Sequence, residues 1–233
     1  MHIWRFFEAL QKAKFTAMNK TLLITRPNYD LGTNFLYFWS LAVIEKAKEK
    51  GFKILDLSGK KANKKSFSSY IKKHKPFLVF INGHGSSDTV TGHNNEPLIE
   101  VNKNDSVLKN KVIYARSCDS AQKLGFESIK KGCLAFLGYK KKFFLVHSKK
   151  SVSRPLQDKL AGLFLLPSNL LVISILKGNT AENSFERSQK AMSQNLSFML
   201  STKASVLERD AALYLYSNKI NQVLLGDPKV KIT

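Results

Sequence analysis

The chain has 233 residues, 43% of them hydrophobic and 11% aromatic, which predicts one globular domain with a sizeable core and excludes a disordered or fibrous chain. Its 38 Lys and Arg residues against 17 Asp and Glu give a formal net charge of +21, which would attract nucleic acid, an anionic membrane or acidic proteins. The lysines are spread along the chain without an aromatic RNA-binding signature or a helix-turn-helix pattern, so a solvated lysine-rich surface is the preferred interpretation.

The N-terminal segment, residues 1–20, mixes aromatic and charged side chains. It predicts an amphipathic helical extension of a single domain spanning residues 1–233, rather than a secretory signal. Only two cysteines, Cys118 and Cys133, are present, and both lie in apolar surroundings typical of reduced thiols. A cytoplasmic location is therefore expected, with a single disulfide bridge as the open alternative.

Short apolar runs recur along the chain with amphipathic segments between them. Runs of this length predict strands buried on both faces, at residues 21–25, 52–57, 77–82, 111–117 and 133–138. Helical spacing is expected between them, at residues 33–51, 66–74 and 120–131. This alternation predicts an α/β fold with a mostly parallel central sheet covered on both faces by helices.

Three further segments have patterns of their own. Residues 86–101 predict a small hairpin inserted after the third strand. The longest apolar region, residues 160–176, carries Pro167, Ser168 and Asn169 at its middle. It therefore predicts two buried elements around a turn rather than a membrane span. A helix at residues 179–200 and a strand-like segment at 222–232 complete the domain.

Two neighbouring strands end in residues whose side chains can take part in catalysis. One closes as FLVFINGHG and places His84 just outside the sheet, and the next closes as VIYARSCDS and places Cys118 at the corresponding position. The carboxyl ends of parallel strands share one edge of a sheet, where reactive crevices form. We therefore expect the two side chains to face each other.

A Cys and a His in that arrangement are sufficient for nucleophilic catalysis, because imidazole can accept the thiol proton near neutral pH. The amide N–H groups of Gly85 and Cys118 are the candidate oxyanion hole. Taken separately, a cysteine at a strand end is usually a small buried hydrophobe and His-Gly is a common turn. Their matching positions favour catalysis.

The HG and SC pairs, in that order, and the Gly-Asp-Pro at residues 226–228 resemble the caspase, gingipain and legumain superfamily of cysteine peptidases. Gingipain-like catalytic domains are the most similar, over the chain from Thr21 onward, although Ala121 replaces a glycine found in many relatives. The resemblance implies a caspase-like three-layer sandwich and a cysteine endopeptidase with a protein or peptide substrate. No metal or cofactor is expected, because the remaining histidines lack the spacing of a metal site.

The resemblance also implies a substrate pocket. The residue two before the nucleophile often lines it, which here is Arg116, and Arg26 follows the first strand where related folds supply pocket residues. Two arginines would favour an acidic side chain before the scissile bond. Alternatively, Arg116 pairs with Asp119 and Arg26 is solvated, or Asp30, Asp88 and Asp119 favour a basic side chain instead.

A nonenzymatic caspase-like module is the alternative function. It would bind nucleic acid or an acidic partner through the basic surface, and its binding would weaken steeply with salt. The sequence makes no prediction of the oligomeric state.

Overall fold

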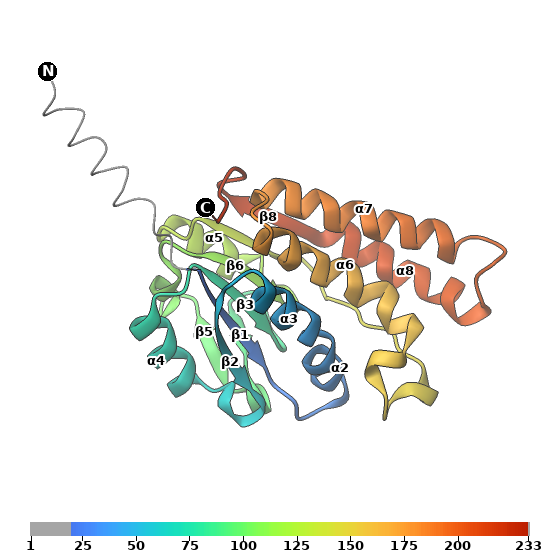
Figure 1. Cartoon of the computed structure of the whole chain (residues 1–233), viewed down its shortest axis with the longest axis horizontal. Coiled ribbons are helices and arrows are strands. Elements are labelled where there is room, and N and C mark those ends of the chain that lie inside the picture. The colour runs from blue at the N-terminus through green and yellow to red at the C-terminus, as the bar shows by residue number, and fades with distance from the viewer. Residues whose placement is uncertain (1–19, 233) are drawn as a thin grey trace, which may run out of the picture.

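The computed structural model describes residues 20–232, so nearly all of the N-terminal extension expected at residues 1–20 lies outside the described residues. Its centre is a six-stranded sheet (Figure 1), parallel except for its last strand, which runs antiparallel at one edge. In spatial order the strands are β2 (Lys53–Ser58), β1 (Thr21–Arg26), β3 (Leu78–Asn82), β6 (Val112–Arg116), β7 (Ala135–Tyr139) and β8 (Gln222–Gly226).

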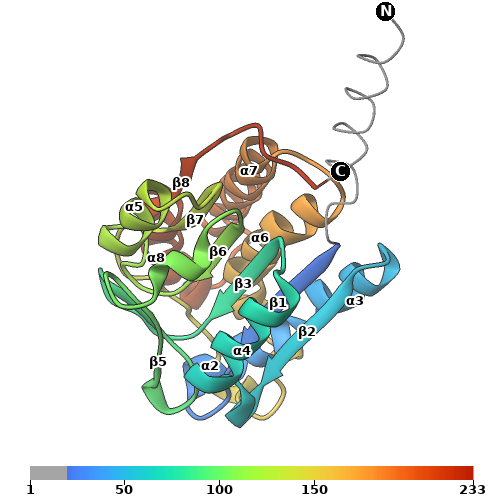
Figure 2. The ribbon, with the colours of Figure 1, turned by 90° about the vertical axis from the view of Figure 1, so that its left-hand side faces the viewer.

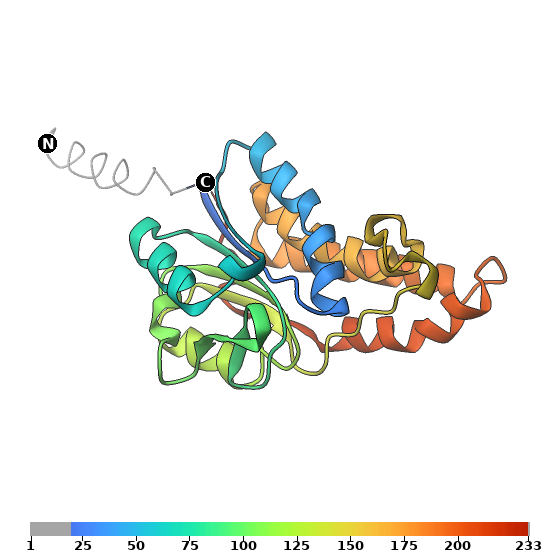
Figure 3. The same ribbon diagram turned by 90° about the horizontal axis from the view of Figure 1, so that it is seen from below.

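Helices cover both faces of this sheet, as Figures 2 and 3 show from two further directions. The α-helices are α2 (Leu31–Trp39), α3 (Leu41–Glu49), α4 (Lys64–His74), α5 (Lys123–Lys130), α6 (Lys159–Leu176), α7 (Ala181–Met199) and α8 (Val206–Asn221). Short 3-10 helices occupy Gly59–Lys61, His93–Asn95, Asp105–Leu108, Lys149–Ser151 and Pro155–Gln157. The predicted hairpin is formed by β4 (Thr89–Thr91) and β5 (Pro97–Glu100).

Alternate side chains of the strands pack into two separate cores, one on each face of the sheet. Phe80 and Tyr114 belong to the core that α3 and α6 cover, whereas Val79 and Ile113 belong to the core that α4, α5 and the hairpin cover. A third apolar cluster lies where α2, α6, α7 and α8 pack together, in the part of the molecule that projects beyond the sheet in Figure 1. The predicted α/β three-layer arrangement with a mostly parallel sheet is confirmed.

The predicted turn at Pro167 is wrong, because residues 159–176 form one continuous helix, α6. Proline has no N–H to donate to the carbonyl four residues earlier, which is that of Leu163. Asn195 on α7 donates its Nδ2 to this carbonyl at 2.7 Å. A side chain from the neighbouring helix therefore replaces the missing hydrogen bond.

Helix α6 is also long and apolar enough to cross a membrane, but 72% of it is buried inside the protein. The core helix of a globular domain has the same composition, so α6 gives no indication of a span. Its polar residues point to the same conclusion, since Ser168 and Asn169 are buried and hydrogen-bonded to the strands or to α2.

A buried polar network fixes the ends of β3 and β6 relative to the helical layer. Arg116, fully buried, donates Nε to Asn82 Oδ1 and Nη1 to Asn169 Oδ1, both at 2.9 Å. Asn82 donates in turn to the Thr25 carbonyl at 2.8 Å, and Asn169 donates to the Trp39 carbonyl at 2.7 Å. One guanidinium thus connects β1, β3, β6, α6 and α2.

Among residues 20–232, no carboxylate pairs with this guanidinium, and burial lowers the pKa of Arg116 to about 10. The ring of Phe80 lies 4.9 Å from its central carbon, which adds a cation–π contact. Hydrogen bonds from the guanidinium to two amide oxygens, together with the aromatic face, stabilise the charge inside the protein.

We predict that Arg116→Met lowers the free energy of unfolding by about 2–4 kcal/mol, because Asn82 and Asn169 would each keep a buried oxygen without its donor. Urea denaturation followed by circular dichroism measures this change. Arg187→Met on the exposed side of α7 is the matched control, with an expected change below about 0.5 kcal/mol. Equal stability of the two variants would contradict the role assigned to the network.

Candidate active site at the carboxyl edge of the sheet

The predicted convergence of two strand ends is seen in the register of the sheet. Asn82, the last residue of β3, pairs with Arg116, the last residue of β6. His84 and Cys118 each follow two residues later, at the same edge. Both residues line one cavity of about 70 Å³, together with Gly83 and Ser117.

His84 is held in place by its backbone and by its ring. Its carbonyl accepts hydrogen bonds from the N–H and the hydroxyl of Thr91, at 3.0 and 3.2 Å. A Cβ at the preceding residue, Gly83, would overlap the Thr91 carbonyl, so only glycine allows this close approach. The ring Nε2 lies 2.7 Å from Asp30 Oδ2. The carboxylate is therefore hydrogen-bonded to Nε2 and not to the other ring nitrogen, Nδ1.

Asp30 is the site residue whose role sequence reasoning missed. It is the N-cap of α2, where Oδ1 accepts the Thr33 N–H at 2.7 Å. Partial burial on its own would raise the pKa of Asp30, but hydrogen bonds from Thr33 and His84 outweigh it and lower the pKa below its ordinary value. An aspartate directly before a helical segment indicates a cap, but a partner 54 positions away is not visible in the sequence.

Cys118 is half-buried beside this pair, and burial raises the pKa of its thiol above the ordinary value. The Phe143 backbone, whose carbonyl lies 3.9 Å from Sγ, and the charge of Lys142 lower this pKa, whereas the charge of Asp119 raises it further. The resting form is therefore the thiol, so nucleophilic attack requires a base. His84 is the residue with a basic side chain in the lining of the same cavity.

Gly85 packs directly on the cysteine. A Cβ built on Gly85 would lie 3.0 Å from the Cys118 carbonyl oxygen. The local pairing of Gly85 with Val90 uses the His84 and Thr89 carbonyls and the Thr91 and Ser86 N–H groups. Within residues 20–232, neither the N–H of Gly85 nor that of Cys118 has a backbone acceptor on another residue.

The structure does not place the two predicted specificity arginines in this cavity. Arg116 is enclosed in the network beneath it and is fully buried. Arg26 makes a two-pronged ion pair with Asp56, at 2.9 and 2.5 Å, and donates to the Tyr37 carbonyl. Neither guanidinium lines the cavity, although Nη2 of Arg116 has no hydrogen-bond partner among residues 20–232. The expected binding of an acidic substrate side chain by these arginines stays a prediction, but not one that this cavity supports.

Asp119 does not line the cavity and instead stabilises a local turn. Its backbone adopts φ +57°, a left-handed turn that aspartate tolerates, and its Oδ1 accepts from Gln122 Nε2 at 3.0 Å. The predicted pairing of Asp119 with Arg116 is also absent, because the partners of Arg116 are Asn82, Ser168 and Asn169. Among residues 20–232, no three His, Cys, Asp or Glu side chains gather as a metal site.

The comparisons with known proteins concern the fold. No family model matches the sequence, and no curated protein matches it. The crystal structure of the Arg-specific cysteine proteinase gingipain R (RGPB) is similar to this chain with a TM-score of 0.59 and 11% identity, over 93% of this chain and 49% of that one.

A complex of the Porphyromonas gingivalis RgpB pro- and mature domains is similar with a TM-score of 0.51 and 11% identity, over 92% of this chain and 48% of that one. The chain thus spans about half the length of these solved chains. At such identity the likeness concerns the fold alone. The chain has the caspase-like α/β fold of the gingipain proteinases.

Proposed function

We propose that this chain is a cysteine endopeptidase in which Cys118 is the nucleophile and His84 its general base. The observation that carries the proposal is the shared cavity at the carboxyl edge of the sheet, which Cys118 and His84 both line. The gingipain-like fold supports the reaction class, since both similar structures are cysteine proteinases.

Asp30 gives the histidine ring its orientation. Its carboxylate accepts the Nε2 proton of His84 at 2.7 Å, which fixes the tautomer with an unprotonated Nδ1. This nitrogen accepts the Cys118 proton as Sγ attacks the substrate carbonyl carbon. The carboxylate also stabilises the imidazolium that forms.

The reaction then follows the usual course of acyl transfer. The N–H groups of Gly85 and Cys118 donate to the oxyanion of the tetrahedral intermediate. The His84 imidazolium gives its proton to the leaving amine, and the acyl group remains bonded to Sγ. A water molecule, deprotonated by His84, attacks the carbonyl carbon of this thioester. The C–Sγ bond then breaks, Sγ takes the proton back from His84, and the carboxylic acid leaves.

The proposed location is a reducing compartment such as the cytoplasm. Cys118 and Cys133 are both free thiols in the structure, which supports a chemistry that requires a free Cys118.

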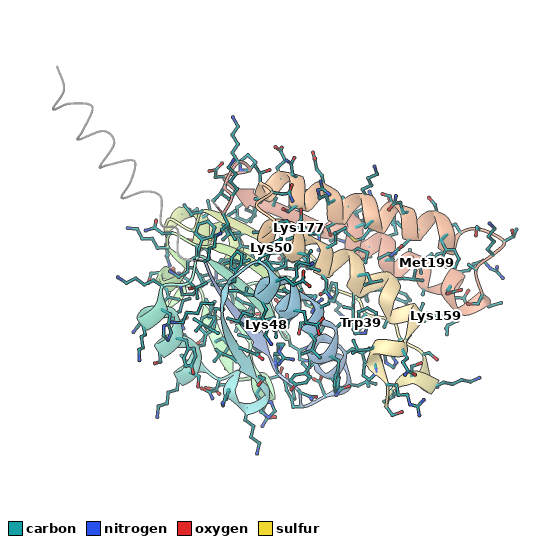
Figure 4. All side chains as sticks on the ribbon, in the orientation of Figure 1. Trp39, Lys48, Lys50, Lys159, Lys177 and Met199 are labelled. Carbon is teal, nitrogen blue, oxygen red and sulfur yellow. The ribbon has the colours of Figure 1, made fainter. Side chains whose placement is uncertain are left out.

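A second candidate function, binding of an acidic partner or nucleic acid, is favoured by clustered lysines. Lys50, which follows α3, and Lys177, which follows α6, are labelled side by side in Figure 4, and both are exposed and act on the Glu49 carboxylate. Affinity that falls steeply with salt and is unchanged in Cys118→Ala would support this candidate. The absence of any Cys118-dependent turnover in the same preparation would complete that case.

We predict that Cys118→Ala and His84→Ala each lower kcat/KM for peptide hydrolysis by at least about a thousandfold, since each removes a reacting group. Fluorogenic peptide assays measure the loss, and circular dichroism verifies the fold. Cys133→Ala is the matched control and should keep its turnover, because Cys133 is buried in the core. Turnover retained in Cys118→Ala would overturn the assignment.

For Asp30→Asn, we expect kcat/KM to fall by about tenfold to a hundredfold. Asparagine still caps α2, because its side-chain oxygen accepts the Thr33 N–H. The substitution therefore removes the negative charge next to His84 with little effect on stability, which thermal unfolding checks. An unchanged kcat/KM would show that Asp30 only caps the helix.

The raised pKa of Cys118 predicts how alkylation depends on pH. Only the thiolate reacts with iodoacetamide, so the rate should rise about tenfold per pH unit between pH 7 and 9. Burial raises the pKa of Cys133 to about 12, so the Cys118→Ala variant should stay unmodified over this range. A rate that is flat from pH 6 to 9 would indicate a preformed thiolate–imidazolium pair and contradict the proposed resting state.

A further inference from the structure

The lining and the size of the cavity beside Cys118 indicate which substrate side chain it can bind. Resting on the proposed peptidase function, we propose that it binds the substrate side chain preceding the scissile bond and selects a small, uncharged side chain such as that of alanine, valine or threonine. The observations that carry this inference are its lining, its size and the absence of Arg26, Arg116 and Asp119 from that lining.

The lining is mainly apolar. Leu36 of α2 and Phe143 and Leu145 of the segment after β7 contribute the hydrophobic wall. The Thr33 hydroxyl also lines the cavity, but it is already bonded to Asp30, at 2.8 Å from Oδ1. Apart from His84 and Cys118, no side chain of the lining is ionisable.

One polar atom at this wall has no partner. Ser117 is 1% exposed, and its Oγ makes no hydrogen bond to another described residue. Ser117 lines the cavity next to Cys118, so a substrate hydroxyl could satisfy it. The hydroxyl of a threonine substrate residue can bond to this group, and valine has the same shape as threonine.

The size of the cavity, about 70 Å³, suits a small side chain. A water-sized group needs roughly 10–15 Å³ of such space, so the cavity holds about five to seven of them. The three heavy atoms of a valine or threonine side chain fit easily in this space, whereas the seven of an arginine side chain fill it or exceed it.

Neither an acidic nor a basic side chain would find a counter-charge. Arg26 is paired with Asp56, and Arg116 is bound within the interior. The Asp30 oxygens are taken by Thr33 and His84, and Asp119 accepts from Gln122. An ionised side chain in this apolar cavity would lose its hydration without compensation, which disfavours Asp, Lys and Arg alike.

The wall formed by the segment after β7 is anchored. Asn218 of α8 donates Nδ2 to the Phe144 carbonyl at 2.7 Å, and its Oδ1 accepts the Phe144 N–H at 2.8 Å. The Phe143 ring packs on Tyr139 with 4.8 Å between centroids. This anchoring keeps the shape of the cavity before a substrate arrives.

The test is a panel of fluorogenic peptides that differ only at the residue before the cleaved bond, with Ala, Val, Thr, Asp, Lys or Arg. We expect kcat/KM for Ala, Val or Thr to exceed the values for Asp, Lys and Arg by about tenfold or more. Cleavage that depends on Cys118 but is fastest after Asp, Lys or Arg would overturn the inference and leave the peptidase function standing. Absence of Cys118-dependent cleavage across the panel would overturn both.

Leu145→Arg tests the cavity wall itself. A guanidinium at this half-buried position should raise kcat/KM for the Asp peptide relative to the Val peptide by about tenfold. Leu200→Arg, at a 71% exposed position after α7, adds the same charge outside the cavity and should leave the ratio unchanged. An equal shift in both variants, or no shift in the folded Leu145→Arg protein, would contradict the inference.

Discussion

The guanidinium of Arg116 is the interaction on which the rest of the site depends. It is buried, with no carboxylate partner in the described part of the chain, so its charge is tolerated only while Asn82 and Asn169 present their oxygens to it. These bonds tie the end of β3 to the end of β6 and both to α6. Because His84 and Cys118 follow those two strand ends by two residues each, the network sets their separation before any contact with substrate is made.

Around this centre, each wall of the site has a separate structural origin. The first turn of α2 provides Asp30, whose two oxygens cap the helix and orient His84. The hairpin fixes the His84 backbone through Thr91, and the segment after β7 closes the cavity with Phe143. The lining of this single cavity thus comes from four parts of the chain, namely α2 and the segments after β3, β6 and β7.

Much of the sheet could be predicted because β1, β3, β6 and β7 are short continuous apolar runs, and the strand ends carrying His84 and Cys118 followed from them. Helix α8 was missed, since Leu213 and Ile220 are exposed while Ala212 and Leu215 are buried, which removes the helical periodicity. The turn expected at Pro167 failed because the bond that rescues the helix comes from α7. The side-chain partners of Arg26 and Arg116 could not be predicted for the same reason, because they lie 30 or more positions away in the chain. Local patterns reveal elements, but not these tertiary partners.

The central claim is that Cys118 is activated by His84, and covalent capture tests it most directly. The purified protein would be incubated with a peptide vinyl sulfone carrying valine at its reactive end and then digested for mass spectrometry. The account predicts one adduct per chain, on Cys118, forming at least about a hundredfold more slowly in His84→Ala. An adduct on Cys133, or equal rates of Cys118 modification with and without the histidine, would contradict it.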